Sequence, residues 1–173
     1  VFPGNHAGFY PDSKTLSMKL LFRENGEILG AQIVGFEGTD KRIDIISTVI
    51  HGHMTVSDLA ELELAYAPAF GSAKDAVNIA GYVAQNYLEG LVDFFYPEDI
   101  ADLRDTDGVF LDVRTQKEFE RGHIEGAVHI PVDSLRERMN ELDKSKPLYV
   151  YCGVGLRGYV AYRILVQEGF KVS

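Results

Sequence analysis

Residues 147–164 read PLYVYCGVGLRGYVAYRI and contain the only cysteine of the chain, Cys152. The residues before Cys152 are mostly apolar and aromatic, which is typical of a buried strand. Glycines are frequent directly after it, and from Leu156 onward apolar residues recur at the spacing of an α-helix. A strand, a glycine-rich turn and a helix in this order predict a parallel α/β sheet. They place Cys152 at the carboxyl edge of that sheet, where such folds form their ligand sites.

The segments around this stretch continue the alternation of strands and helices. We expect strands at residues 109–114, 126–131 and 147–152, and helices at residues 99–103, 116–122, 132–142 and 157–169. Strands and helices that alternate through short connections predict a mostly parallel sheet with helices on both faces. Residues 170–173 read as the beginning of a further strand.

The first half of the chain follows a different pattern, which predicts a separate domain. Two apolar strands at residues 17–37 surround Asn25-Gly26, a pair that favours a tight hairpin turn. Thr55 and Asp58 have the spacing of a capping box. We expect helices after the hairpin, at residues 40–50, 59–65 and 73–87. The sequence therefore predicts an α+β domain with an antiparallel sheet at residues 1–92, followed by an α/β domain with a mostly parallel sheet at residues 93–173.

Composition and charge limit the class of protein. The chain has 173 residues, 46% of them hydrophobic, and a formal net charge of −9, which is typical of globular rather than disordered protein. Its scattered Lys and Arg residues argue against nucleic acid and anionic membranes as partners. One cysteine makes no internal disulfide, and the chain shows no signal peptide or apolar run of about 18 residues, so we expect a cytoplasmic location. Because it starts at Val1 and stops in a strand, we expect a fragment of a longer protein.

The turn after Cys152 is suited to stabilise a negatively charged sulfur. Backbone N–H groups of the turn, the positive end of the next helix and the guanidinium of Arg157 would all favour a thiolate, which is the nucleophilic form. Glycine lets the backbone approach an anion without a Cβ in the way. Alternatively, Cys152 is a small buried apolar residue at a strand end.

The number of residues between the cysteine and the arginine distinguishes two reactions. Both use a loop of backbone N–H groups around a reactive cysteine. Arg157 follows Cys152 by five positions. Cysteine phosphatases place their arginine one position further along, because their loop wraps a tetrahedral phosphoryl group. The tighter loop here favours a persulfide over a phosphocysteine, and a cysteine phosphatase-like domain is kept as the less favoured alternative.

The second domain resembles the rhodanese family of sulfurtransferases over about residues 95–173. The matching motifs are Asp112-Val113-Arg114, Glu118-Phe119, Gly122-His123-Ile124, Gly126-Ala127, Ile130-Pro131 and the loop from Cys152 to Arg157. The resemblance implies that Cys152 is the sulfur-accepting nucleophile and that Arg157 supports the bound anion or persulfide. It also implies a substrate-binding loop that comprises Gly153, Val154, Gly155, Leu156 and Gly158, although Gly158 stands where relatives often carry Ser.

Three further residues of this domain have open roles. Asp112 and Arg114 either orient the Cys152 loop from the neighbouring strand end or form a pair that holds the fold. His123 is a possible base by residue type, but the rhodanese pattern places it in a turn that positions the next strand.

The first domain resembles the carboxyl-terminal dimerisation domain of FAD-dependent pyridine nucleotide-disulfide reductases over about residues 1–90. The runs NHAGFYP, AYAP and SAKD carry the match, at residues 5–11, 65–68 and 72–75. The similarity is greatest to the branch of coenzyme A-disulfide reductases, NADH oxidases and persulfide reductases. It implies a homodimer, and FAD and NAD(P)H, with coenzyme A as a further candidate, bound by other domains of the parent. We expect no cofactor or metal in this fragment, because the family binds them in those other domains.

The same resemblance assigns a role to two tyrosines. Tyr10 and Tyr66 are candidates for the tyrosines that reach the flavin site of the partner subunit, where a phenol can donate a proton or hydrogen bond to a departing thiolate. Phe9 stands where some relatives carry a second tyrosine. Alternatively, both tyrosines are ordinary interface aromatics.

Together the two resemblances predict a fragment of a flavin-dependent coenzyme A-disulfide or persulfide reductase with a sulfurtransferase module. Cys152 would take sulfur from a small-molecule persulfide or polysulfide, and its sulfur would leave to an outside thiol because no second cysteine is present. The alternative from another class is a rhodanese domain that binds a ligand or regulates an NADH oxidase without turnover.

Overall fold

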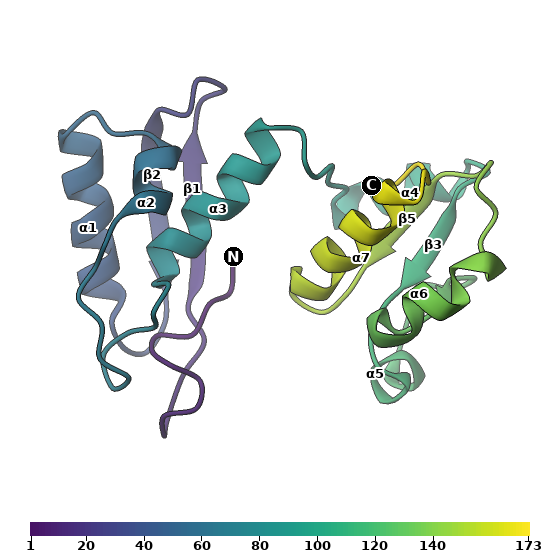
Figure 1. Cartoon of the computed structure of the whole chain (residues 1–173), viewed down its shortest axis with the longest axis horizontal. Helices are drawn as coiled ribbons and strands as arrows, with labels where there is room; N and C mark the ends of the chain where they lie inside the picture. The colour runs from purple at the N-terminus through teal and green to yellow at the C-terminus, as the bar shows by residue number, and fades with distance from the viewer. The chain divides into compact units, whose positions relative to one another are not determined.

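The computed structural model describes all 173 residues, and they form two compact units, Val1–Gly90 and Leu91–Ser173 (Figure 1). Each unit has its own hydrophobic core. None of the helices combines the length and the apolar character that crossing a membrane requires.

The first unit begins with an antiparallel hairpin of β1 (Ser17–Phe22) and β2 (Ile28–Val34). Gly26 turns the chain between them with φ of 84°, a left-handed conformation that glycine adopts without steric cost. Helix α1 (Thr39–His51) follows and packs against β2. The hairpin and this helix are those expected from the sequence.

Two more helices complete the first unit, and both begin with a capping box. The side chain of Thr55 accepts a hydrogen bond from the N–H of Asp58 at the start of α2 (Val56–Glu61). Asp75 caps α3 (Ala76–Leu88), which packs against α2. The core between helices and hairpin is lined mainly by aliphatic side chains, among them Leu16, Met18, Ile28, Ile46, Val49, Val56, Leu59 and Val77.

A buried ion pair joins the loops of the first unit. Arg42 on α1 is 2% exposed, and its guanidinium contacts the carboxylate of Asp75 at 2.7 and 3.0 Å. The same guanidinium donates to the carbonyl oxygen of Asn5 at 2.7 Å. The N–H of Ala7 in turn donates to the carbonyl oxygen of Gly71 at 2.9 Å. The loops that carry Tyr10 and Tyr66 are therefore held together.

The second unit alternates helices with short strands, as the sequence indicates. The 3₁₀ turn η1 (Pro97–Asp99) leads into α4 (Ile100–Arg104), which is followed by β3 (Val109–Asp112), α5 (Gln116–Arg121) and β4 (Val128–His129). The chain then passes through η2 (Val132–Ser134), α6 (Leu135–Arg138) and η3 (Met139–Glu141) to β5 (Leu148–Tyr151) and α7 (Leu156–Gln167).

The single helix expected at residues 132–142 is instead a short α-helix between two 3₁₀ turns. Leu135 and Leu142 are buried, and Val132 and Met139 pack against the same core. Apolar residues three and four positions apart fit either helix type, because 3.0 residues make a turn of 3₁₀ helix and 3.6 a turn of α-helix. The sequence pattern therefore could not separate the two.

The three strands of the second unit form a parallel sheet in the order β4-β3-β5. Asp112 at the end of β3 pairs with His129 of β4 and with Tyr151 of β5, so the three strand ends lie side by side. Val172 forms a parallel bridge with Leu148, which confirms the expected start of a further strand. This carboxyl edge of the sheet carries the candidate site.

Candidate functional site

Cys152 directly follows β5, and its sulfur faces the turn that leads into α7. The N–H groups of Gly155 and Gly158 both donate to Sγ, at 3.1 and 3.3 Å. Gly155 adopts φ of 113°, which residues with a Cβ rarely do, and this conformation aims its N–H at the sulfur. Two backbone donors that converge on one sulfur stabilise negative charge there.

Cys152 is half-buried, and the other loop residues lie around it. Gly158 lies close to it, since a Cβ at this position would stand 3.6 Å from Sγ, an ordinary contact distance. A Cβ at Gly153 would likewise stand 3.4 Å from a terminal guanidinium nitrogen of Arg157. Val154 and Leu156 are 65% and 72% exposed. The loop therefore surrounds the sulfur with backbone N–H groups and presents two apolar side chains at its rim.

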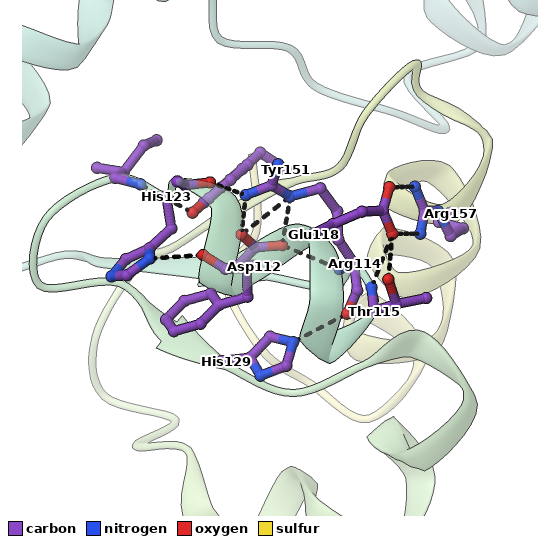
Figure 2. Close-up of polar contacts among 11 residues, drawn as sticks. Asp112, Arg114, Thr115, Glu118, His123, His129, Tyr151 and Arg157 are labelled. Carbon is purple, nitrogen blue, oxygen red and sulfur yellow. Dashed lines mark hydrogen bonds and ion pairs between the residues drawn. The ribbon is translucent and has the colours of Figure 1, made fainter.

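The guanidinium of Arg157 pairs with Glu118 on α5 (Figure 2). Its two terminal nitrogens each donate to one oxygen of Glu118, at 2.7 Å. The N–H and the hydroxyl of Thr115 also donate to Glu118 Oε2, at 3.0 and 2.6 Å. These hydrogen bonds, those of Arg157 first, hold the pKa of Glu118 well below its usual range.

Glu118 is the residue of this site whose role the sequence did not reveal. Glu118 belongs to the Glu118-Phe119 motif of the rhodanese resemblance. The spacing of Thr115 and Glu118 is that of a capping box, which explains the contacts of Glu118 to the start of α5. The pairing with Arg157 spans 39 positions of sequence and arises only from the packing of α5 beside the Cys152 loop.

Asp112 and Arg114 form a second ion pair at the same edge of the sheet. The carboxylate of Asp112 is fully buried and accepts three hydrogen bonds from the guanidinium of Arg114, the shortest at 2.6 Å. Burial by itself raises the pKa of Asp112, but the hydrogen bonds from Arg114 outweigh it and lower that pKa. Arg114 also donates to the carbonyl oxygen of Gly122, at 2.8 Å, and lies over the ring of Tyr151. These contacts tie the connection after α5 to the sheet.

His123 belongs to a stack of rings. It lies parallel to Phe119 with a centroid distance of 3.7 Å, and His129 stacks near the same phenyl ring at 4.4 Å. The Nδ1 atom of His123 contacts the carbonyl oxygen of Phe119, and Nε2 of His129 contacts that of Arg114, both at 2.9 Å (Figure 2). Each histidine thus has a structural partner.

Tyr10 and Tyr66 lie on the first unit, on the two loops that the Ala7–Gly71 hydrogen bond joins. Their side chains are 45% and 47% exposed. The ring of Tyr10 makes an edge contact with His6 at a centroid distance of 5.9 Å. Both hydroxyls are therefore on side chains that a partner molecule can reach.

Comparison with known protein families matches both halves of the chain. Residues 96–173 match the rhodanese-like domain, and residues 2–77 match the dimerisation domain of pyridine nucleotide-disulphide oxidoreductases. The two matches follow each other along the chain without overlap. The fold of each confirms the expectation from sequence: an antiparallel hairpin with helices, then a parallel sheet with helices.

Known relatives match about half or nearly all of the chain. A coenzyme A disulfide reductase of Staphylococcus epidermidis is 42% identical over 86 residues, which make up 49% of this chain and 20% of the relative. Among solved structures, reduced CoADR-RHD of Bacillus anthracis is 44% identical with a TM-score of 0.96, covering 100% of this chain and 31% of that one. A NAD-dependent persulfide reductase of A. fulgidus is 38% identical with a TM-score of 0.87, covering 99% and 31%. The chain thus spans less than a third of the length of these relatives.

The glycine-rich turn of the second unit differs from the turns that bind FAD or NAD(P)H, the cofactors that the resemblance implies for the parent. Dinucleotide folds direct the N–H groups of such a turn at a pyrophosphate. Here the N–H groups of Gly155 and Gly158 are directed at Cys152 Sγ. The turn therefore fits a sulfur group and not a dinucleotide. No group of three or more His, Cys, Asp or Glu side chains is arranged to hold a metal ion.

Proposed function

We propose that this chain is the dimerisation and sulfurtransferase part of an FAD- and NAD(P)H-dependent coenzyme A-disulfide or persulfide reductase. In this proposal Cys152 carries sulfur as a persulfide. The observation that carries it is the sulfur at the carboxyl edge of a parallel sheet, which accepts hydrogen bonds from Gly155 and Gly158. The relatives with both domains, a CoADR-RHD and a persulfide reductase, support it.

The proposed reaction is a sulfur transfer without net oxidation. The thiolate of Cys152 attacks the outer sulfur of a persulfide RS–SH, a new sulfur–sulfur bond forms, and the RS–S bond breaks so that RS⁻ leaves with its electron pair. The N–H groups of Gly155 and Gly158 stabilise the thiolate before the attack. An acceptor thiolate then attacks the outer sulfur of the Cys152 persulfide and leaves Cys152 as a thiolate again.

The acceptor in this proposal comes from outside the chain. Cys152 is the only cysteine, so no second thiol of the same chain can resolve its persulfide. A small-molecule thiol such as coenzyme A, or a cysteine of the flavin-containing part of the parent, would take the sulfur. FAD and NAD(P)H in the parent would supply the electrons that reduce the resulting persulfide or disulfide.

The first unit contributes the dimer surface in this proposal. Tyr10 and Tyr66 are exposed on loops that are held together, and we assign them to the flavin site of the partner subunit. There a phenolic hydroxyl would donate a hydrogen bond to a departing thiolate.

A phosphatase-like reaction has less support from this geometry. A phosphoryl group needs the guanidinium of the loop arginine for its equatorial oxygens. Both terminal nitrogens of Arg157 are already bonded to Glu118. The paired guanidinium therefore favours sulfur transfer over phosphoryl transfer.

Mass spectrometry of the intact chain after exposure to a persulfide donor tests the proposal. We expect one added sulfur atom on the wild-type chain, removable by excess thiol, and none on Cys152→Ser. Because the chain has a single cysteine, a sulfur added to a thiol can be assigned to Cys152. No added sulfur on the wild type, or equal sulfur transfer by Cys152→Ser, would rule out Cys152 as the carrier.

A further inference from the structure

We propose that Glu118 sets the donor preference of Cys152 by neutralising Arg157, so that the loop takes sulfur from an organic persulfide rather than from a dianion such as thiosulfate. This inference rests on the sulfur transfer proposed above. It assigns to Glu118 a positioning role, exerted through Arg157 on the charge that the incoming donor meets.

The pairing leaves Arg157 little freedom to contact a donor. Its two terminal nitrogens are bonded to separate oxygens of Glu118 at equal distances of 2.7 Å, the bidentate arrangement of a strong arginine–carboxylate pair. Thr115 holds Oε2 of Glu118 with two further hydrogen bonds from the start of α5. The carboxylate is thus anchored from its own helix, and the guanidinium has to break two bonds before it can turn to an anion.

Charge at this edge of the sheet is balanced within the network of Figure 2. Arg157 is paired with Glu118, and Arg114 is paired with the buried carboxylate of Asp112. The depressed pKa of Glu118 keeps its carboxylate ionised at neutral pH, so the balance persists. A donor that approaches Cys152 meets backbone N–H groups and paired charges.

Two donor classes respond differently to this balance. An organic persulfide presents a neutral or singly charged outer sulfur, whereas thiosulfate carries two negative charges beside the reacting bond. In the thiosulfate reaction the Cys152 thiolate attacks the outer sulfur, and sulfite leaves with the electron pair of the broken sulfur–sulfur bond. An unpaired guanidinium would favour the dianion most, because electrostatic attraction grows with charge. A guanidinium paired with a carboxylate attracts the dianion less, so thiosulfate is no longer favoured by its charge.

The rim of the loop favours the same donor class. Val154 and Leu156 are among the most exposed apolar side chains of the second unit. They offer apolar contact to the carbon chain of an organic persulfide, whereas thiosulfate has no apolar part to bury.

Replacement of Glu118 by glutamine tests the charge directly. Glu118→Gln keeps the size of the side chain and an oxygen for the hydrogen bonds from Thr115, but it removes the charge that balances Arg157. We expect the ratio of kcat/KM for thiosulfate to that for glutathione persulfide to rise roughly two- to fivefold, the range for a partly exposed ion pair. We also expect kcat/KM for thiosulfate in this variant to fall with added salt, because an unpaired surface charge is screened.

Two variants serve as controls. Glu141→Gln removes the carboxylate of an exposed bidentate pair of the second unit, with Arg138, and should leave the donor ratio unchanged. Glu118→Asp keeps the negative charge and should restore a donor ratio close to that of the wild type. Together these controls show whether a change of the donor ratio comes from losing the charge beside Arg157 or from losing any carboxylate of the second unit.

The wild-type chain provides a test that needs no variant. If Glu118 neutralises Arg157, the kcat/KM of the wild-type chain for thiosulfate should depend only weakly on ionic strength. A steep decrease of this kcat/KM with salt would overturn the inference. An unchanged donor ratio in Glu118→Gln would overturn it as well. If the wild type gains sulfur on Cys152 but these results fail, only the role of Glu118 is wrong. If the wild type gains no sulfur from either donor, the proposed sulfur transfer itself fails.

Discussion

Two carboxylates at the edge of the second sheet each hold an arginine, but their surroundings differ. Asp112 is fully buried, and its partner Arg114 donates a hydrogen bond to the carbonyl oxygen of Gly122. This pair therefore holds backbone segments together. Glu118 is partly exposed, and its partner Arg157 belongs to the Cys152 loop. The contacts of the first pair fit a fold-holding pair, one of the two roles considered for Asp112 and Arg114, whereas the second pair lies at the Cys152 loop.

Asp112 should make the stability of the second unit depend on acid pH. Its pKa is lowered in the folded state, so its ionised form stabilises the fold fully above the usual aspartate pKa of about 3.9, and this contribution is lost as the pH falls through the folded pKa. Asp112→Asn should therefore be less stable than wild type at neutral pH, and the difference should shrink toward about pH 3. Urea unfolding across this pH range measures it.

The control for this prediction is Asp107→Asn. Asp107 is exposed in the turn before β3, and its replacement should leave the urea midpoint close to wild type. A difference between Asp112→Asn and wild type that stays constant from neutral to acid pH would contradict the prediction.

The contact of α2 with α3 depends on a glycine. A Cβ at Gly81 would stand 2.6 Å from the backbone nitrogen of Ala60 and 2.8 Å from its Cα, which is closer than non-bonded atoms approach. Asn78, one turn earlier on α3, donates to the carbonyl oxygens of Leu59, Ala60 and Leu62 and so satisfies the end of α2. The two helices thus approach at backbone distance and are held there by hydrogen bonds.

Gly81→Ala should destabilise the first unit by about 1–3 kcal/mol, the usual effect of overpacking a tight contact. Helix propensity alone would give the opposite sign, since alanine is favoured over glycine inside a helix by about 1 kcal/mol. Chemical denaturation measures the change. Gly30→Ala on β2, where no atom lies within 4 Å of the added Cβ, should change stability little. Stabilisation by Gly81→Ala would show that the helices can separate without cost.

At the scale of the whole molecule, the first unit exposes large apolar side chains on the loops that carry the tyrosines. Phe9 and Phe70 are 80% and 76% exposed. Exposed apolar groups that gather on one surface mark an interaction site more often than single ones do. The match of residues 2–77 to a dimerisation domain supports a second copy of this chain as the partner.

We expect light scattering of the purified chain to give twice the mass of a single copy. Phe70→Ser should shift the chain toward monomer, because it removes apolar surface that dimerisation would bury. Val154→Ser, which removes an exposed apolar side chain from the rhodanese-like domain, should leave the dimer intact. A wild-type chain that remains a monomer at high concentration would contradict the role given to the first unit.

The sequence by itself was sufficient for features that depend on neighbouring residues. The hairpin at Asn25-Gly26, the capping box at Thr55, the strand–turn–helix around Cys152 and the alternation of the second unit all follow from local spacing and conformational preference. Such features depend little on the rest of the fold, because their contacts lie within a few residues of each other.

The tertiary structure decided the contacts that cross the chain. Arg42 meets Asp75 across 33 positions, and Arg157 meets Glu118 across 39, and neither pairing is encoded in a local pattern. Which charged side chains meet depends on how helices and loops pack once their apolar faces are buried. For this reason the sequence could propose Cys152 as a sulfur carrier, whereas only the folded chain shows that Arg157 beside it is already paired with Glu118.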